Sequence, residues 1–308
     1  MLRTIFVPLD GSPLAEHALP FATRLAEVTS ARLVLCRIVP VRIIEPPAED
    51  LALAHEARTY MEGVAGPLTA AGRRVETITQ WGDPAACIVD EVQSQQADIV
   101  VMATHGRSGP GRWVYGSVAD AVLRAAPVPV VLVPPAVKQL WPSGHLDRIV
   151  VPLDGSSLSE AALGPAQELA RKLDSEIVLV SIVPFPPYSV YDNGAAMSVF
   201  EPEAELAESE RYLRDVASRA ISEGIQVRTY TELEQPVVAI ANVADQEQAG
   251  LIIMATHGRS GLARLVLGSV ATGTLQRTRV PLMLVGPGVL RREAATSTGP
   301  AAILSTVG

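Results

Sequence analysis

The fold is decided by the stretch Val101–Gly109, which reads Val-Met-Ala-Thr-His-Gly-Arg-Ser-Gly and occurs twice. The second copy, Ile253–Gly261, differs only in its first residue. In each copy a Gly-Ser-Val triplet begins seven residues after the last glycine, at Gly116–Val118 and at Gly268–Val270. A turn by itself does not require the same spacing twice. The repeat therefore indicates a functional segment that the chain carries in two copies.

The sequence around the first copy is typical of a helix entrance that binds an anion. The short apolar run Asp98–Met102 is bounded by turn residues, as in a buried parallel strand. Ser117 and Asp120 have the spacing of a capping box, so we predict a helix that runs to about Ala126. A glycine-lined loop that ends at a helix N-terminus presents free N–H groups to a phosphate. The alternative is an ordinary turn followed by a helix cap, which uses the same residue types.

Composition limits the classes of function. The 308 residues suit two domains of about 150 residues each. The net charge of −8 argues against a nucleic-acid-binding surface and against a polybasic membrane contact. Lys138 and Lys172 are the only lysines, which excludes a phosphate loop of the form GxxxxGK[ST]. A phosphate would have to be held by backbone groups, hydroxyls and arginines.

The cysteines and the first residues indicate the compartment. Cys36 lies in a strand-like run and Cys87 in a helical one, and neither has a plausible disulfide partner. We expect both to be buried in a reducing compartment. A strand follows Arg3 directly, and no apolar run approaches the roughly 18 residues of a membrane span. We therefore expect a cytoplasmic protein with neither membrane nor nucleic acid as a partner.

The whole chain is an internal repeat. Ile5–Ser12 returns as Ile149–Ser156, 144 residues later, whereas the two glycine segments lie 152 residues apart. Eight residues have thus been inserted in the second copy, in or near Pro184–Pro202. A repeat of this length is a domain. We predict domains at 1–135 and 146–288, a linker at 136–145 and a disordered tail at 289–308.

Strands alternate with helices in each copy. This order predicts the α/β class, with right-handed βαβ units and a parallel sheet covered on both faces. In such sheets the ligand crevice lies at the carboxyl ends of the strands, where we expect Asp10 and Ala103. The strands expected in the first copy are Thr4–Leu9, Leu33–Val39, Val75–Gln80, Ile99–Ala103 and Val130–Val133.

These motifs resemble the universal stress protein family in its tandem two-domain form. The resemblance rests on Pro-Leu-Asp-Gly-Ser at each start, Ala-Thr-His-Gly-Arg-Ser-Gly at each fourth strand and the Gly-Ser-Val triplets. It implies two Rossmann-like (adenine nucleotide alpha hydrolase-like) domains, each with five parallel strands in the order 3-2-1-4-5. Members that bind ATP carry the motif G-x2-G-x9-G-[ST]. Here Ala103 and Ala255 replace the first glycine, and one methyl group is tolerated where φ is negative.

The resemblance also implies roles for individual residues. Asp10 and Asp154 would lie by the adenosine, the backbone of Ile38 and Ile182 would read the adenine edge, and Met102 and Met254 would line base and ribose. His105 and His257 would lie beside the phosphates. The phosphates would be held by Gly106, Gly116, Ser117 and Val118, and by Gly258, Gly268, Ser269 and Val270. The ligand would be ATP, or else ADP or AMP, with Mg²⁺ as a companion that Asp10 or Ser117 could hold.

For the aspartates and histidines simpler roles stay open. An aspartate after a strand is a common turn former, and a loop histidine often caps a local backbone group. Family members often pair their fifth strands across domains, so we expect Val128–Val133 and Val280–Val285 to form an intrachain pseudo-twofold pairing. A homodimer is a further option. We expect the two copies to differ in affinity, since Gly82 has no counterpart in the second copy.

Three functions remain. The first is a nucleotide-responsive regulatory module in stress. The second is slow ATP hydrolysis or nucleotidyl transfer, although the repeats share neither a Ser-His-Asp arrangement nor a metal-ligand motif such as HExxH. The third is a scaffold without nucleotide, in which Ala103 and Ala255 close the phosphate site.

Overall fold

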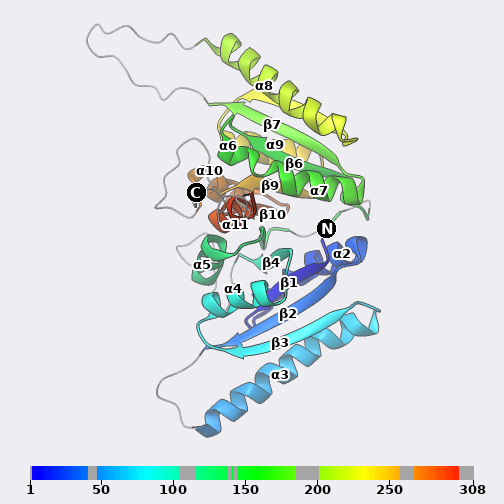
Figure 1. Ribbon diagram of the computed structural model, residues 1–308, viewed down its shortest axis with the longest axis vertical. Coiled ribbons are helices and arrows are strands. Elements are labelled where there is room, and N and C mark those ends of the chain that lie inside the picture. The colour runs from blue at the N-terminus through cyan, green and yellow to red at the C-terminus, as the bar shows by residue number, and fades with distance from the viewer. Residues whose placement is uncertain are drawn as a thin grey trace, which may run out of the picture. The chain divides into compact units, whose positions relative to one another are not determined.

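The computed structural model describes residues 2–40, 47–104, 116–137, 140–141, 144–184, 201–256 and 267–297. These residues form two compact units (Figure 1). Unit 1 comprises the described residues up to 140 and those from 281 onward. Unit 2 comprises the described residues between 141 and 280. The compact units therefore do not coincide with the sequence repeats, because the end of the second repeat belongs to unit 1.

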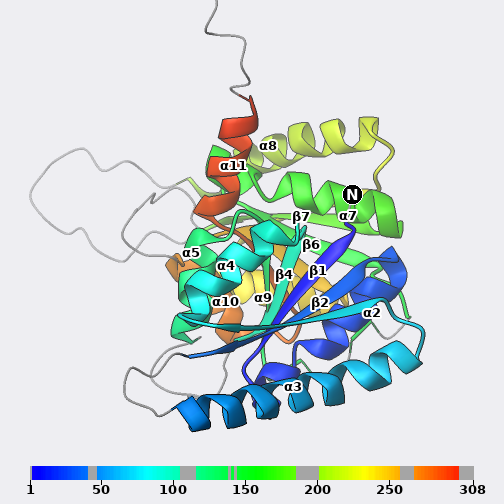
Figure 2. The same ribbon diagram turned by 60° about the horizontal axis from the view of Figure 1, so that its bottom comes forward.

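Unit 1 is a three-layer α/β unit with strand order β3-β2-β1-β4-β5-β10. The first five strands are parallel and follow the predicted order 3-2-1-4-5. Figure 2 shows α3 and α4 on opposite sides of the strands. The elements are β1 (Thr4–Leu9), α1 (Pro13–Glu16), α2 (Leu19–Thr29), β2 (Arg32–Val39), α3 (Pro47–Ala70), β3 (Val75–Trp81), α4 (Pro84–Ser94), β4 (Ile99–Ala103), α5 (Ser117–Ala125), β5 (Val130–Val133), β10 (Leu282–Val285) and α11 (Pro287–Ser297).

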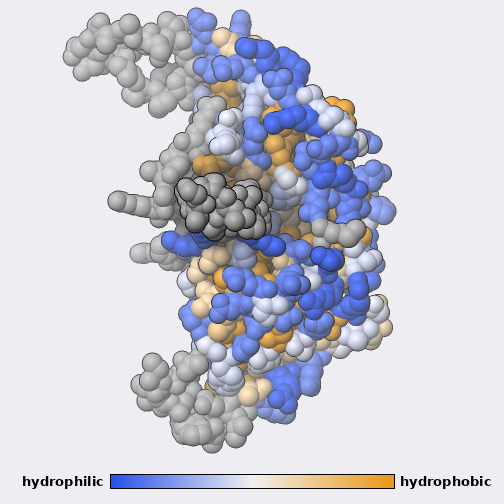
Figure 3. Space-filling model, in the orientation of Figure 1, coloured by the Kyte–Doolittle hydropathy of each residue, from blue (hydrophilic) through white to orange (hydrophobic). Residues whose placement is uncertain are grey.

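Unit 2 repeats this plan with strand order β9-β6-β7-β8, all parallel. Its outermost helix α8 buries only one stripe of side chains and presents a hydrophilic outer face (Figure 3). The elements are β6 (Arg148–Leu153), α6 (Ser157–Glu160), α7 (Leu163–Leu173), β7 (Glu176–Val183), α8 (Pro202–Ser222), β8 (Val227–Leu233), α9 (Pro236–Gln246), β9 (Leu251–Ala255) and α10 (Ser269–Arg277).

The central strands are buried along their whole length. Every residue of β1 and all of β6 except Arg148 is buried. Helices cover both faces of the sheet, so these strands lack the alternation of polar and apolar residues that a half-exposed strand shows. Phe6 and Phe21 are among the largest fully buried side chains. This continuous burial is why the strands could be recognised from short apolar runs.

The predicted pairing of the fifth strands is present within unit 1. β10 is antiparallel to β5, and every residue of both strands is buried. Met283 lies opposite Val131, which is its own counterpart in the repeat, so these two strands are related by a local twofold. The pairing covers an apolar strand edge that would otherwise be open to aggregation.

The prediction of a disordered tail is wrong for residues 289–297. There the chain forms α11, which packs on α5. A Cβ on Gly288 would collide with the Ala126 carbonyl oxygen, so the glycine allows α11 to approach the end of α5 closely. The Arg291 side chain also donates to the Arg124 carbonyl oxygen over 3.1 Å. Weak sequence periodicity concealed a helix that tertiary contacts stabilise, and residues 298–308 lie outside the described part.

A charged network joins the strands of unit 2 at the end opposite their carboxyl ends. Glu247 is 7% exposed and accepts from Arg228 Nη1 at 3.0 Å and from the Tyr230 hydroxyl. Arg148 Nε lies 3.1 Å from Glu176 Oε2 and 3.4 Å from Glu247 Oε2. The Tyr230 hydrogen bond, followed by the charges of the two arginines, lowers the pKa of Glu247.

We predict that this network makes the stability of unit 2 depend on pH. A lowered folded-state pKa contributes stability that is present above the ordinary glutamate pKa of 4.5 and is lost as the pH falls below it. Glu247→Gln should therefore cost about 1–2 kcal/mol at pH 7 and flatten the decline below pH 5. The measurement is hydrogen exchange of the β8 amides between pH 7 and pH 4.

Glu210→Gln is the matched control for this substitution. Glu210 pairs with Arg214 at 3.4 Å, but its side chain is 56% exposed. Its loss should cost less than about 0.5 kcal/mol. Equal effects of the two substitutions would show that the network around Glu247 adds no more than an ordinary surface ion pair.

Candidate functional site

Each unit has a pocket at the carboxyl ends of its strands. The pocket of unit 1 has a volume of about 300 Å³ and lies beside the ends of β1, β2 and β4. The pocket of unit 2 has a volume of about 580 Å³ and lies beside the ends of β6, β7 and β9. These are the equivalent edges of the two sheets, where parallel α/β folds bind ligands.

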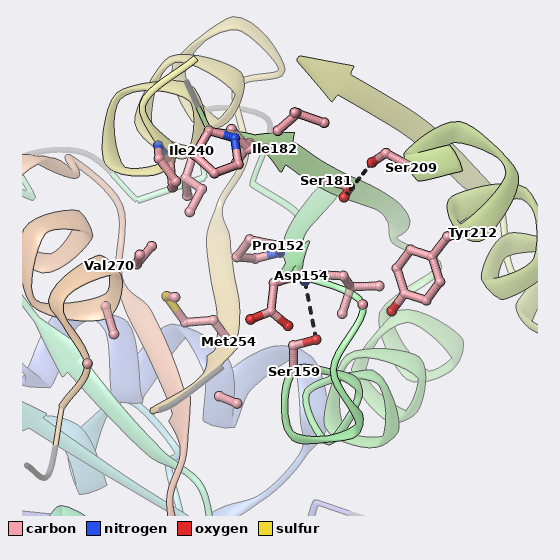
Figure 4. A pocket seen from close by; sticks show the side chains of 18 of the residues that line it. Pro152, Asp154, Ser159, Ser181, Ile182, Ser209, Tyr212, Ile240, Met254 and Val270 are labelled. Atoms are coloured by element: carbon pink, nitrogen blue, oxygen red, sulfur yellow. Dashed lines mark hydrogen bonds between the residues drawn. The ribbon is translucent and has the colours of Figure 1, made fainter. Parts of the chain in front are cut away.

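The predicted site residues that the structure describes all line these pockets. In unit 1 they are Asp10, Ile38, Met102, Ala103, Gly116, Ser117 and Val118. In unit 2 they are Asp154, Ile182, Met254, Ala255, Gly268, Ser269 and Val270. Figure 4 shows Asp154, Met254 and Val270 around one cavity, with Ile182 and Ile240 forming a further part of its wall. The predicted residues His105, Gly106, His257 and Gly258 lie outside the described residues.

The aspartates have the turn-forming role that the sequence left open as the simpler alternative, and they also line the pockets. Asp10 Oδ1 accepts from the Ser12 backbone N–H at 2.9 Å and from the Ser12 hydroxyl at 2.6 Å. Ser12 in turn accepts from Ala15 N and caps α1, while Gly11 between them has φ +80°. Asp10 is thus a turn former, and it also lines the pocket. Asp154 and Ser156 repeat this arrangement in unit 2.

The helix entrance differs from the predicted capping box. Gly116 is the N-cap of α5, and no side chain accepts a hydrogen bond there. Ser117 is the first helical residue, and Asp120 instead pairs with Arg124 at 2.6 Å. Gly268 caps α10 in the same way. The capping-box prediction is therefore wrong. No side chain caps the N-terminus of either helix, and the first turn of each helix borders its pocket. This is the geometry of a helix N-terminus that binds an anion.

The alanine that replaces the first motif glycine fits the backbone. Ala103 is the last residue of β4 and Ala255 the last residue of β9. Neither is among the described residues with positive φ, so neither needs a glycine for conformational reasons. The condition under which the methyl group is tolerated is met in both units.

The strand ends expose backbone beside the predicted base-reading residues. β1 pairs with β2 as far as Leu9 opposite Arg37, whereas β2 continues along β3 to Val39. The edge of Ile38 that faces β1 is therefore beyond the ladder and borders the pocket. β7 extends past the end of β6 in the same manner at Ile182. A strand overhang of this kind offers hydrogen-bonding groups to a planar ligand.

The cysteine of the unit 1 pocket is not a catalytic nucleophile. Cys36 lines the unit 1 pocket, and burial raises the pKa of its thiol to about 12, so it is no nucleophile at neutral pH. Burial, together with a hydrogen bond to Glu16, also raises the pKa of Tyr60.

Within the described ranges, no three His, Cys, Asp or Glu side chains lie close enough together to hold a metal ion. The described helices include none long and apolar enough to cross a membrane.

Sequence reasoning missed the polar residues that line the pockets from the second strand, from the helix after it and, in unit 2, from the short helix α6. These are Arg37 in unit 1 and Ser159, Ser181, Glu205, Glu208, Ser209 and Tyr212 in unit 2. None belongs to the glycine motif. Comparing the two repeats position by position would have found the contrast between Arg37 and Ser181, because both precede the predicted base-reading isoleucine.

We predict that Gly116 is not needed for folding. Its φ of −72° suits any residue, and an added Cβ would meet only the Thr104 carbonyl oxygen, at 3.9 Å. Gly116→Ala should cost less than about 1 kcal/mol in the free energy of unfolding. Gly82→Ala, at φ +152° and with a Cβ 2.6 Å from Cys87 Sγ, should cost more. Urea denaturation of both variants is the test, and a larger loss for Gly116→Ala would make that glycine structural.

Comparisons with known proteins agree with this arrangement. The model of the universal stress protein family matches residues 1–134 and 145–286. A universal stress protein of Mycobacterium tuberculosis is 28% identical over 299 residues, covering 91% of this chain and 95% of that protein. Another, from Methanocaldococcus jannaschii, is 29% identical over 138 residues, which are 45% of this chain and 81% of that protein.

Solved structures show the same fold along most of the chain. A universal stress protein from Archaeoglobus fulgidus aligns with a TM-score of 0.68 at 20% identity, covering 92% of this chain and 96% of that one. A putative universal stress protein from Pseudomonas aeruginosa aligns with a TM-score of 0.60, also at 20% identity, over 96% and 98% of the two chains. With both repeats matched by the family model, the chain belongs to the universal stress protein family, in its tandem form.

Proposed function

We propose that this protein binds adenine nucleotides at the carboxyl ends of its strands and acts as a nucleotide-responsive stress module in the cytoplasm. ATP is the first candidate ligand, followed by ADP and AMP. The observation that carries the proposal is the repeated combination of an aspartate after the first strand, an exposed edge at the end of the second strand and, after the fourth strand, a helix N-terminus without a side-chain cap. The aspartate suits the adenosine, the strand edge suits the adenine base, and the helix N-terminus suits the phosphates.

The base is assigned to the second strand. In unit 1, Ile38 and Ile88 supply apolar walls, and the overhanging backbone at Ile38 supplies hydrogen-bonding groups. Ile182 and Ile240 are the counterparts in unit 2. Flat apolar walls with a few directional polar groups are typical of pockets for planar ligands. Met102 and Met254, on the neighbouring fourth strands, then line base and ribose.

The phosphates are assigned to the helix entrances. Gly116 N donates to the Thr104 carbonyl oxygen at 2.8 Å, and Gly268 N donates to the Thr256 carbonyl oxygen at 2.8 Å. These bonds fix the cap residue while the N–H groups of the next turn point along the helix axis. The first turn with its positive dipole then binds phosphate oxygens, and Ser117 and Ser269 add hydroxyls. Mg²⁺ would be held mainly by the phosphates, with Asp10 or Ser117 as the protein ligand.

We predict that the purified protein contains or binds up to two adenine nucleotides per chain. The measurement is chromatography of the nucleotide released on denaturation, followed by calorimetric titration with ATP. Gly116→Val should abolish binding in unit 1 and Gly268→Val in unit 2, because a branched side chain keeps a phosphate away from the backbone. The double variant should bind none.

Gly63→Ala is the control glycine substitution, since an added Cβ there meets no atom within 4 Å and Gly63 lies outside both pockets. It should leave ATP binding unchanged. A folded wild-type protein that neither releases nucleotide nor gives heat with millimolar ATP would exclude the nucleotide function and favour a scaffold.

A further inference from the structure

The two pockets differ in charge at one position of the second strand. Arg37 is the residue of β2 opposite Leu9, and Ser181 is the residue of β7 opposite Leu153. Both line their pockets, and both directly precede the isoleucine to which we assign the base. The two repeats thus place a guanidinium and a small hydroxyl at the same point of the same backbone.

Arg37 lines the unit 1 pocket and brings a fixed positive charge to its wall. The residue is only 6% exposed, and its guanidinium carbon lies 6.0 Å from the centre of the Tyr60 ring. Tyr60 is itself held by a hydrogen bond of 3.0 Å to Glu16. An arginine stays protonated at any physiological pH, and its fork of N–H groups suits phosphate and carboxylate oxygens. A buried guanidinium that lines a pocket therefore favours an anionic group there.

Ser181 gives the unit 2 pocket the opposite character. Ser209 on α8 donates to Ser181 Oγ at 2.7 Å, and Figure 4 shows this pair on the side of the cavity where Tyr212 also lies. The pocket extends along α8 to Glu205 and Glu208, and it is the larger of the two. Hydroxyls and carboxylates accept hydrogen bonds from ligand hydroxyls, whereas the carboxylates repel a further anion.

The described charges add up differently in the two pockets. Asp10 and Arg37 are the charged lining residues of unit 1, so they balance. Those of unit 2 are Asp154, Glu205 and Glu208, all negative. The glycine loops, which lie outside the described residues, carry the same arginines in both repeats and so do not create the contrast.

We propose that Arg37 makes unit 1 a site for a nucleotide with a second anionic group on its ribose, whereas unit 2 takes a nucleotide with free ribose hydroxyls. The inference rests on the proposed function. With the base at β2 and the phosphates at β4, the ribose lies over the end of β1, which is flanked by Arg37. Arginine at the end of a second strand is also how dinucleotide-binding folds accommodate a ribose phosphate.

The test compares two probes in single-pocket variants. The probes are adenosine 5′-monophosphate and adenosine 3′,5′-bisphosphate, titrated calorimetrically at fixed salt. Gly268→Val leaves the unit 1 pocket, which should bind the bisphosphate about tenfold more tightly than the monophosphate. Gly116→Val leaves the unit 2 pocket, which should bind the bisphosphate no more tightly, or more weakly. Equal ratios of the two affinities in both pockets overturn the inference.

Exchanging Arg37 and Ser181 tests whether the arginine causes the difference in the affinity ratio. Arg37→Ser in the unit 1 background should bring the affinity ratio to about one, and Ser181→Arg in the unit 2 background should raise it. Arg24→Ser removes the same charge from α2, outside the pocket, and should leave the ratio unchanged. If Arg37→Ser fails to fold, Ser181→Arg decides alone. A ratio that does not follow the arginine overturns the inference while the proposed function stands. A protein that binds ATP but neither probe also overturns only the inference, whereas a protein that binds neither the probes nor ATP overturns both.

Discussion

Both pockets depend on where the first strand of each repeat stops. β1 ends at Leu9, whereas the neighbouring β2 runs on to Val39. The turn that stops it needs Gly11 at φ +80° and an aspartate that binds Ser12. If β1 continued for two more residues, its ladder would use the edge of Ile38 and fill the space above it. The cavity is thus a consequence of backbone geometry, and the side chains around it decide only what it binds.

The two repeats show separately what the backbone geometry determines and what the side chains determine. The turn, the strand overhang and the glycine-capped helix are present in both repeats, and most of the residues that line the unit 1 pocket have an identical counterpart in unit 2. Ala15 of unit 1 corresponds to Ser159 of unit 2, just as Arg37 corresponds to Ser181. Replacing a long charged side chain by a short one removes a charge and occupies less volume beside the second strand. One substitution on a constant backbone therefore alters volume and electrostatics together.

Most of the fold could be predicted because its signals are local. Strands buried on both faces are continuous apolar runs, and Asp10 and Gly116 have turn and cap chemistry that shows in short stretches of sequence. Three features depended on contacts that a sequence does not display. Ser117 looked like a cap, yet Gly116 takes that place. Segment 289–297 has little periodicity, yet glycines let it dock on α5. Arg37 resembles any strand residue until its burial beside Tyr60 is seen.

The placement of β10 connects the chemistry of one repeat to the folding of the other unit. The first turn of α10 borders the unit 2 pocket, and the same helix leads through residues 278–281 into β10, which is buried in unit 1. Gly273 in the middle of α10 lies against Val237, so the helix is packed closely on α9. A ligand that binds the folded helix entrance stabilises the helix by mass action. Because helix formation is cooperative, that stabilisation extends toward Arg277 and to the segment that enters unit 1. A ligand bound at the proposed site of the second repeat would thereby act on the stretch of chain that leads into unit 1.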